Sequence, residues 1–153
     1  MDFIAIPCNS AHVYDDELAA SINVSLLNII SETLAWLSGS GRTPLLSTRG
    51  TLESGLYQSG FEKAGLAFHF HDDWQPKGNQ IIALIKSGDI EKGASSHWRG
   101  FLEDLKKTQI EQAAMACTDL NAVLPFSETD IALIDSTQAL AKVTVNVDIG
   151  GSG

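Results

Sequence analysis

The sequence has little cysteine, little positive charge and no long apolar run. Two of its 153 residues are cysteine, and ten lysine and arginine residues face nineteen aspartate and glutamate residues, which gives a net charge of -9. A chain this acidic, without a basic stripe, lacks the surface that nucleic acid or an acidic membrane requires. No apolar run approaches the roughly 18 residues of a membrane span. We therefore expect a small-molecule ligand or a protein partner, with no nucleic acid and no membrane.

The scarcity of cysteine bears on the compartment. Two cysteines without a charged and apolar signal segment favour a reducing, cytoplasmic location, in which thiols stay free. Composition alone leaves three roles open for the pair: a disulfide, a metal site or two thiols of the core, of which core thiols are the commonest. With 44% apolar and 19% charged residues, the chain is typical of a soluble globular protein with a real core.

The order of apolar segments predicts the fold class. Residues 3–6 are apolar and β-branched, which indicates a buried strand that ends at Pro7. Residues 13–38 suggest one or two helices around an apolar patch at 24–30. Further strands are expected at 45–48, 66–70, 131–137 and in the apolar run 113–120, where the strand ends at Cys117. Helices are expected at 49–65, 79–93, 97–110 and from 138 onward. Strands that alternate with helices predict an α/β fold with a mostly parallel sheet and flanking helices.

Two of these strands end in similar sequences. "IAIPCNS" ends one strand at Cys8 and "AAMACTD" ends another at Cys117, each followed by a capping residue. Ligands bind at the carboxyl ends of parallel strands, and a helix beginning there lowers the pKa of a thiol. Two thiols that face one cleft can act as base and acid on opposite sides of a carbon atom. The pattern predicts proton transfer with inversion of a stereocentre.

Two other kinds of site fit less well. A hydrolase would need a G-x-S-x-G motif, which is absent, although Cys8 and His12 could still pair across one helical turn. In "FHFHDD", His69 and His71 lie on the same face of a strand and suggest a metal. No third, distant ligand is identifiable, so we expect no metal site.

Three segments together resemble one known family. "PCNSAH" at 7–12, "STRGTLESGLY" at 47–57 and "ACTDL" at 116–120 are similar to the aspartate/glutamate racemases, cofactor-independent enzymes with two catalytic cysteines. The resemblance implies two pseudo-symmetric α/β domains with the substrate between them, and neither pyridoxal phosphate nor metal. The catalytic residues would be Cys8 and Cys117. The substrate-binding residues would be Asn9, Ser10, Thr48, Lys86 and Thr118.

The implied function is inversion of the Cα of an acidic amino acid by proton transfer between the two thiols. Lys86 would hold the distal carboxylate, although a lysine on an amphipathic helix is equally often a surface group. The sequence departs from the family pattern at Ser10, where threonine is usual, and at Asp119, where glutamate is common. The alternatives are a related decarboxylase or isomerase, which usually keeps one cysteine, and an inactive remnant that binds a partner.

The resemblance also divides the chain. Residues 1–40 would be part of a first domain, 41–130 a complete second domain, 131–149 a return to the first, and 150–153 a linker-like tail. Similar family members carry roughly 70 to 80 further residues before the first strand, so we expect the chain to begin where the first domain is half built. An uncovered sheet edge would result. A second copy of the chain or a partner fragment could cover this edge, or the segment could be partly disordered. Of these we expect a homodimer.

Overall fold

The expected α/β fold with parallel sheets is confirmed. The computed structural model describes residues 2–38 and 41–150, with side chains up to residue 146. Its strands form two sheets, a pair β1-β2 and a four-stranded sheet of order β4-β3-β5-β6. Within each sheet, all neighbouring strands are parallel. The strands are β1 (Phe3–Ala5), β2 (Ser25–Leu27), β3 (Thr43–Ser47), β4 (Phe68–His69), β5 (Gln112–Ala116) and β6 (Ala132–Asp135).

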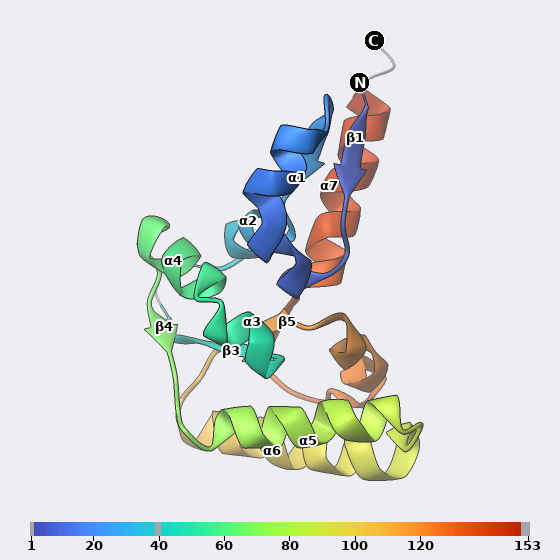
Figure 1. The fold of residues 1–153 in the computed structure, drawn as a ribbon. Coiled ribbons are helices and arrows are strands. Elements are labelled where there is room, and N and C mark those ends of the chain that lie inside the picture. Colours follow the sequence, from blue (N-terminus) through green and yellow to red (C-terminus); the bar gives the residue numbers. More distant parts are fainter. Residues whose placement is uncertain (1, 39–40, 151–153) are drawn as a thin grey trace.

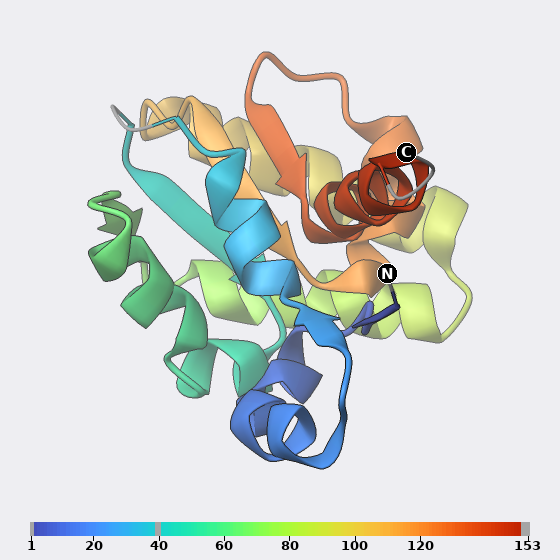
Figure 2. The same cartoon turned by 90° about the horizontal axis from the view of Figure 1, so that it is seen from above.

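Helices cover both faces of the larger sheet. In Figures 1 and 2, α5 and α6 lie side by side on one face, while α2, α4 and α7 lie on the other. Within the described ranges, no helix has the length and apolar character needed to cross a membrane. The helical segments are η1 (Asn9–Tyr14), α1 (Asp15–Ser21), α2 (Ile29–Ala35), α3 (Arg49–Glu53), α4 (Leu56–Lys63), α5 (Trp74–Lys86), η2 (Ile90–Ala94), α6 (Ser95–Lys107), η3 (Thr118–Phe126) and α7 (Ser136–Gly150).

The core forms on the two faces of the central strands. Every residue of β3 and β5 is buried, as expected for parallel strands that are covered on both sides. Leu46 and Met115 pack with Trp98 toward α5 and α6. Leu45 packs with Tyr57 on the opposite face. Packing on both faces therefore holds the two central strands in position. The segments that follow them begin from these well-packed strand ends.

The smaller sheet belongs to a second group of elements. β1 pairs with β2, and α2 packs against α7 from the far end of the chain. Figure 1 shows β1, α1, α2 and α7 gathered on one side of the four-stranded sheet. The range 131–149, which we expected to return to the first domain, divides between the two groups. Its strand β6 pairs with β5 in the larger sheet, and only α7 joins the second group, which contains β1 and β2.

Four element predictions need correction. The helix expected over 79–93 begins earlier, at Trp74, and ends at Lys86, because Gly88 adopts φ 86° before the separate π-helix η2. The apolar patch at 24–30 contains strand β2 between the two helices α1 and α2. The single helix expected over 49–65 is two helices, because Gly55 adopts φ 70° between α3 and α4. The strand expected at 66–70 is ladder-paired only at Phe68 and His69. Of the linker-like tail, residues 151–153 lie outside the described residues.

Candidate active site

The two cysteines occupy equivalent positions in the backbone. Cys8 follows β1 and precedes the 3-10 helix η1, with φ -146° and ψ 110°. Cys117 follows β5 and precedes the 3-10 helix η3, with φ -147° and ψ 123°. Both residues are extended and stand at the N-cap of the helix that follows. The similarity between the two sequence segments is therefore also a similarity of local structure.

One cavity receives both cysteines. It has a volume of about 180 Å³, and all seven residues expected at the site line it. A larger hollow of about 490 Å³ between α5 and α6 shares none of them. The residues that line the smaller cavity are Cys8, Asn9, Ser10, Thr48, Thr51, Lys86, Ala116, Cys117, Thr118 and Asp119.

The environment of Cys8 favours its thiolate. The side chain is exposed, and its Sγ lies 3.5 Å from the hydroxyl oxygen of Ser10. The hydrogen bond with Ser10 is the main cause that lowers the pKa of Cys8, and the backbone N–H groups of Ala11 and Ser10 act in the same direction. Together they outweigh the partial burial, which raises it. Amides at the start of a helix stabilise a negative charge in this way.

The environment of Cys117 favours its thiol. Burial is the main cause that raises the pKa of Cys117, and the negative charge of Asp119 adds to it. The backbone N–H groups of Asp119 and Leu120 and the charge of Lys86 oppose the shift without cancelling it. The Cys117 thiol points toward Asp119 Oδ2 at 3.9 Å. The two thiols thus have pKa values shifted in opposite directions within one cavity.

Lys86 reaches the cavity from the last turn of α5. Its Nζ lies 3.7 Å from Asp119 Oδ2, and the two side chains are 64% and 39% exposed. An ion pair this exposed adds little stability, because water screens it. Its effect is local, because it places a carboxylate beside the lysine within the same cavity.

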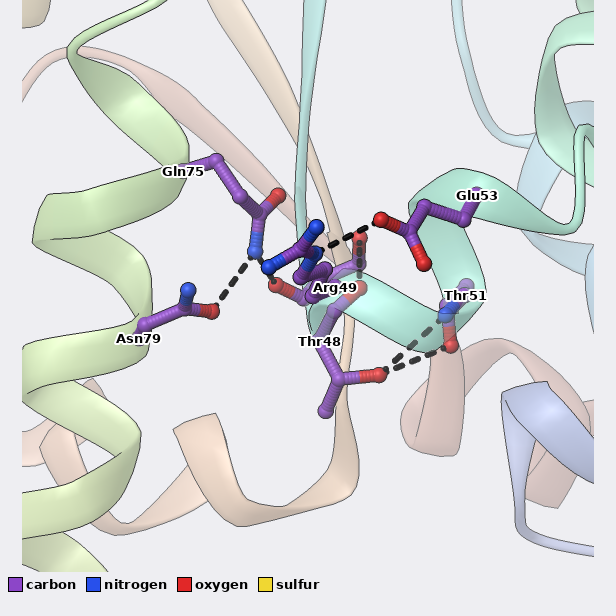
Figure 3. Close-up of polar contacts among 7 residues, drawn as sticks. Thr48, Arg49, Thr51, Glu53, Gln75 and Asn79 are labelled. Atoms are coloured by element: carbon purple, nitrogen blue, oxygen red, sulfur yellow. Dashed lines mark hydrogen bonds and ion pairs between the residues drawn. The ribbon is translucent and has the colours of Figure 1, made fainter.

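The turn after β3 forms a further wall. Thr48 is the N-cap of α3, where its Oγ1 accepts a hydrogen bond from the backbone N–H of Thr51 at 3.3 Å and donates to the Thr51 hydroxyl at 3.1 Å. From α5, Gln75 donates to the carbonyl oxygen of Ser47 at 2.9 Å (Figure 3). Gln75 also donates to Asn79 on the same helix. These contacts hold the Thr48 turn beside α5.

The histidines do not take part in the site. His12 is buried, with Nδ1 2.7 Å from Asp15 Oδ1 and Nε2 3.2 Å from the carbonyl oxygen of Ile6. It ties η1 to Ile6, in the segment after β1, and to Asp15 at the start of α1. The pairing with Cys8 that its spacing suggested is not formed. Over residues 2–38 and 41–150, no group of three or more histidine, cysteine, aspartate or glutamate residues could hold a metal ion.

Asn9 lines the cavity, but its side chain points into the protein. Only 4% of the residue is exposed, and its amide lies between two buried partners. Its Oδ1 accepts a hydrogen bond from the hydroxyl of Tyr57 at 2.5 Å, and its Nδ2 donates to Ser136 Oγ at 3.0 Å. The part of Asn9 that faces a ligand is therefore its backbone.

The sequence reasoning missed Thr51 and Tyr57. Thr51 stands three residues after Thr48, which is the spacing of a helix-capping pair and could have identified it. Tyr57 carried no such signal, because an aromatic residue at a helical apolar position is expected to be plain core.

Comparison with known proteins identifies the family. A model of the Asp/Glu/hydantoin racemase family matches residues 1–144. With two equivalent cysteines on one cavity of a parallel α/β fold, the chain belongs to this family, as its motifs predicted.

Individual relatives support the assignment. The chain is similar to the broad specificity amino-acid racemase RacX of Bacillus subtilis, at 36% identity over 147 residues that cover 95% of this chain and 64% of that protein. Among solved structures, an aspartate racemase from Picrophilus torridus matches with a TM-score of 0.81 and 27% identity, covering 95% of this chain and 62% of that one. An aspartate racemase homologue from Pyrococcus horikoshii shares the fold, with a TM-score of 0.76 and 20% identity.

The chain covers these relatives only in part. It spans 64% of RacX, and 62% and 66% of the two solved structures. This partial coverage is consistent with one domain being partial, as the resemblance implied.

Proposed function

We propose that the protein is a cofactor-independent amino-acid racemase in which Cys8 and Cys117 transfer protons at opposite faces of the substrate Cα. The observation that carries the proposal is the cavity of about 180 Å³ that both thiols line, each from the N-cap of a 3-10 helix. Membership of a racemase family supports the reaction class. No residue in this scheme calls for a cofactor.

The opposite pKa shifts assign a starting role to each thiol. A two-base racemase needs one thiolate to remove the α-proton and one thiol to deliver a proton to the other face. The lowered pKa of Cys8 favours it as the thiolate, and the raised pKa of Cys117 favours it as the thiol. A pair of titratable groups whose environments separate their pKa values is the usual mark of such a division. The reverse reaction starts from the opposite protonation state.

Substrate groups would be held at the cavity walls. The backbone amides that begin η1 and η3, with the hydroxyls of Ser10, Thr48 and Thr118, can bind the α-carboxylate and ammonium groups. Helix N-termini bind carboxylates well. Lys86 is the cation at the cavity and would hold the distal carboxylate of aspartate or glutamate.

A second candidate is a racemase with a wider substrate range. Lys86 already lies 3.7 Å from Asp119, so an acidic substrate must share this lysine with a carboxylate. A neutral amino acid avoids that competition. RacX, the relative with 36% identity, is described as having broad specificity.

The two-thiol mechanism is tested with single variants in D₂O. The variants are made in a chimera of this chain with the part of RacX that it does not cover, because we expect the chain alone to turn over slowly. We expect C8S and C117S each to abolish racemisation, while each variant still exchanges the α-hydrogen of one enantiomer, because one thiol serves each face. Dialysis against a metal chelator, without added pyridoxal phosphate, should leave the native rate unchanged. Full racemisation in either cysteine variant would rule the mechanism out.

Ligand protection tests the site without requiring turnover. Aspartate or glutamate should slow the alkylation of both Cys8 and Cys117 by iodoacetamide, and failure to protect either thiol would contradict the shared site. Lys86→Met then separates the two substrate candidates. A loss of protection by aspartate but not by alanine favours the acidic substrate, whereas equal protection by both in the native protein favours the wider range.

A further inference from the structure

We infer that a buried polar network centred on the β6–α7 junction positions both cysteine segments, with Tyr57 and Ser136 as positioning residues for Cys8 and Asn121 as the positioning residue for Cys117. The inference rests on the proposed function, because it concerns how the two thiols are held at the separation that a substrate needs.

The first arm of the network holds the segment after Cys8. Asn9 is the first residue of η1. Its side-chain amide is hydrogen-bonded to Tyr57 from α4 and to Ser136 at the start of α7. All three residues are buried, Tyr57 and Ser136 completely. Burial raises the pKa of Tyr57, so its hydroxyl stays neutral and able to donate. Without these partners the buried amide of Asn9 would have no hydrogen bonds to replace those it makes with water, and the folded state would be destabilised. The two hydrogen bonds therefore favour one position of Asn9.

The second arm holds the segment after Cys117. Asn121 is half-buried in η3, four residues after Cys117. With its amide turned so that the nitrogen rather than the oxygen faces Asp135, it donates to both carboxylate oxygens, at 2.9 and 3.0 Å. Asp135 ends β6 and also accepts from the backbone N–H of Thr137 at 3.0 Å. Asp135 and Ser136 are consecutive, so the two arms meet at one peptide unit.

The meeting point lies between the two groups of elements. β6 pairs with β5 in the four-stranded sheet, whereas α7 packs against α2 in the group that carries Cys8. The β6–α7 junction is therefore the place where the chain passes from the Cys117 side to the Cys8 side. A network at this point fixes one thiol relative to the other, and proton transfer from both faces of one carbon atom depends on such positioning.

The Cys8 arm is tested by the pH midpoint of alkylation at each cysteine. In Tyr57→Phe and Ser136→Ala, η1 loses an anchor, and the Ser10 hydroxyl and the Ser10 and Ala11 amides bind the Cys8 thiolate less well. We expect the Cys8 midpoint to rise by about half a pH unit, so that labelling at pH 7 slows about threefold. The Cys117 midpoint should not move. Peptide mass spectrometry after iodoacetamide treatment follows the two thiols separately.

Tyr14→Phe is the matched control, because Tyr14 is 58% exposed and lies in the same helix η1. It should leave both midpoints at the native values. Should Tyr57→Phe fail to fold, as judged by circular dichroism, Ser136→Ala carries the test alone. A native Cys8 midpoint in folded Ser136→Ala overturns the first arm.

For the Cys117 arm, we expect the alkylation midpoint to shift in the opposite direction. Asn121→Ala frees η3 to admit water around Cys117, whose pKa is raised mainly by burial. Its alkylation midpoint should fall, and that of Cys8 should stay. An unchanged Cys117 midpoint overturns this arm.

Racemase kinetics separate this inference from the proposed function. In an active protein, Ser136→Ala should lower kcat with little change in KM. Alkylation needs no turnover, so shifted midpoints in a protein that racemises nothing would defeat the proposed function and leave the network standing. Native midpoints in an active racemase would defeat the network alone.

Discussion

At the scale of single residues, the two cysteines are alike in backbone and unlike in environment. Both are extended N-cap residues before a 3-10 helix. Cys8 is exposed and hydrogen-bonded to Ser10, whereas Cys117 is buried beside Asp119. Similar geometry with different solvation is what separates the pKa values of two identical groups.

This difference predicts which thiol ionises first. The pKa of Cys8 is lowered and that of Cys117 is raised, so the thiolate of Cys8 forms at a lower pH. Iodoacetamide reacts with thiolates, and we expect the alkylation midpoint of Cys8 to lie below that of Cys117. Ser10→Ala should move only the Cys8 midpoint, and upward, because the lost hydrogen bond favours the charged form. A midpoint for Cys117 at or below that of Cys8 would contradict the assignment.

Sequence motifs brought the right residues to the cavity but did not say how each is used. The matching strand ends and the family motifs named seven positions, and all seven line it. The roles depend on partners that are distant in sequence. Asn9 binds Tyr57 and Ser136, 48 and 127 positions away, and no local pattern announces such contacts.

At the scale of elements, the sequence predicted long, well-patterned segments and missed short ones. α5 and α6 span thirteen residues each and carry clear helical periodicity. β2 has three residues, which are too few to show alternation, and its strand conformation depends on pairing with β1. The break between α3 and α4 is a single residue, Gly55, in the left-handed region.

Gly55 gives a stability prediction at this scale. An added Cβ would meet no atom within 4 Å, so Gly55→Ala costs only the left-handed backbone, about 1–2 kcal/mol of unfolding free energy. Gly100 also has open space at its Cβ but lies inside α6 with an ordinary helical backbone. Gly100→Ala should therefore stabilise the protein by about 0.5–1 kcal/mol. Urea denaturation measures both, and a stabilised Gly55→Ala protein would contradict the strain at this turn.

At the scale of the whole molecule, the two sides of the cavity are built unequally. The Cys117 side follows β5, a fully buried strand at the centre of four. The Cys8 side follows β1, which among the described residues pairs with β2 alone and leaves Ile4 38% exposed. Cys8 is itself exposed.

The unequal walls predict weak catalysis by the 153-residue chain alone. Thiols are weak bases toward an α-carbon, and they need a closed, water-poor cleft in which amides and hydroxyls hold the substrate. Good positioning contributes about 7–11 kcal/mol to such reactions. An amino acid in a cavity that is open to water beside Cys8 forfeits part of it. We therefore expect little D-isomer when the purified chain is incubated with L-aspartate or L-glutamate.

A chimera measures how much the racemisation rate is lowered by the exposure of the cavity beside Cys8. The chain joined to the part of RacX that it does not cover should racemise far faster than the chain alone. We expect the added segment to cover the exposed Cys8 side of the cavity. The same chimera with Cys8→Ser, and separately with Cys117→Ser, should be inactive in both cases. That result would show that the gain requires both thiols of this chain and does not come from the added segment alone. Chiral chromatography of the product decides the comparison. A turnover near the ~10 s⁻¹ typical of enzymes in the chain alone would contradict this prediction. It would mean that the small sheet of β1 and β2, with Cys8 exposed, is sufficient for full catalysis.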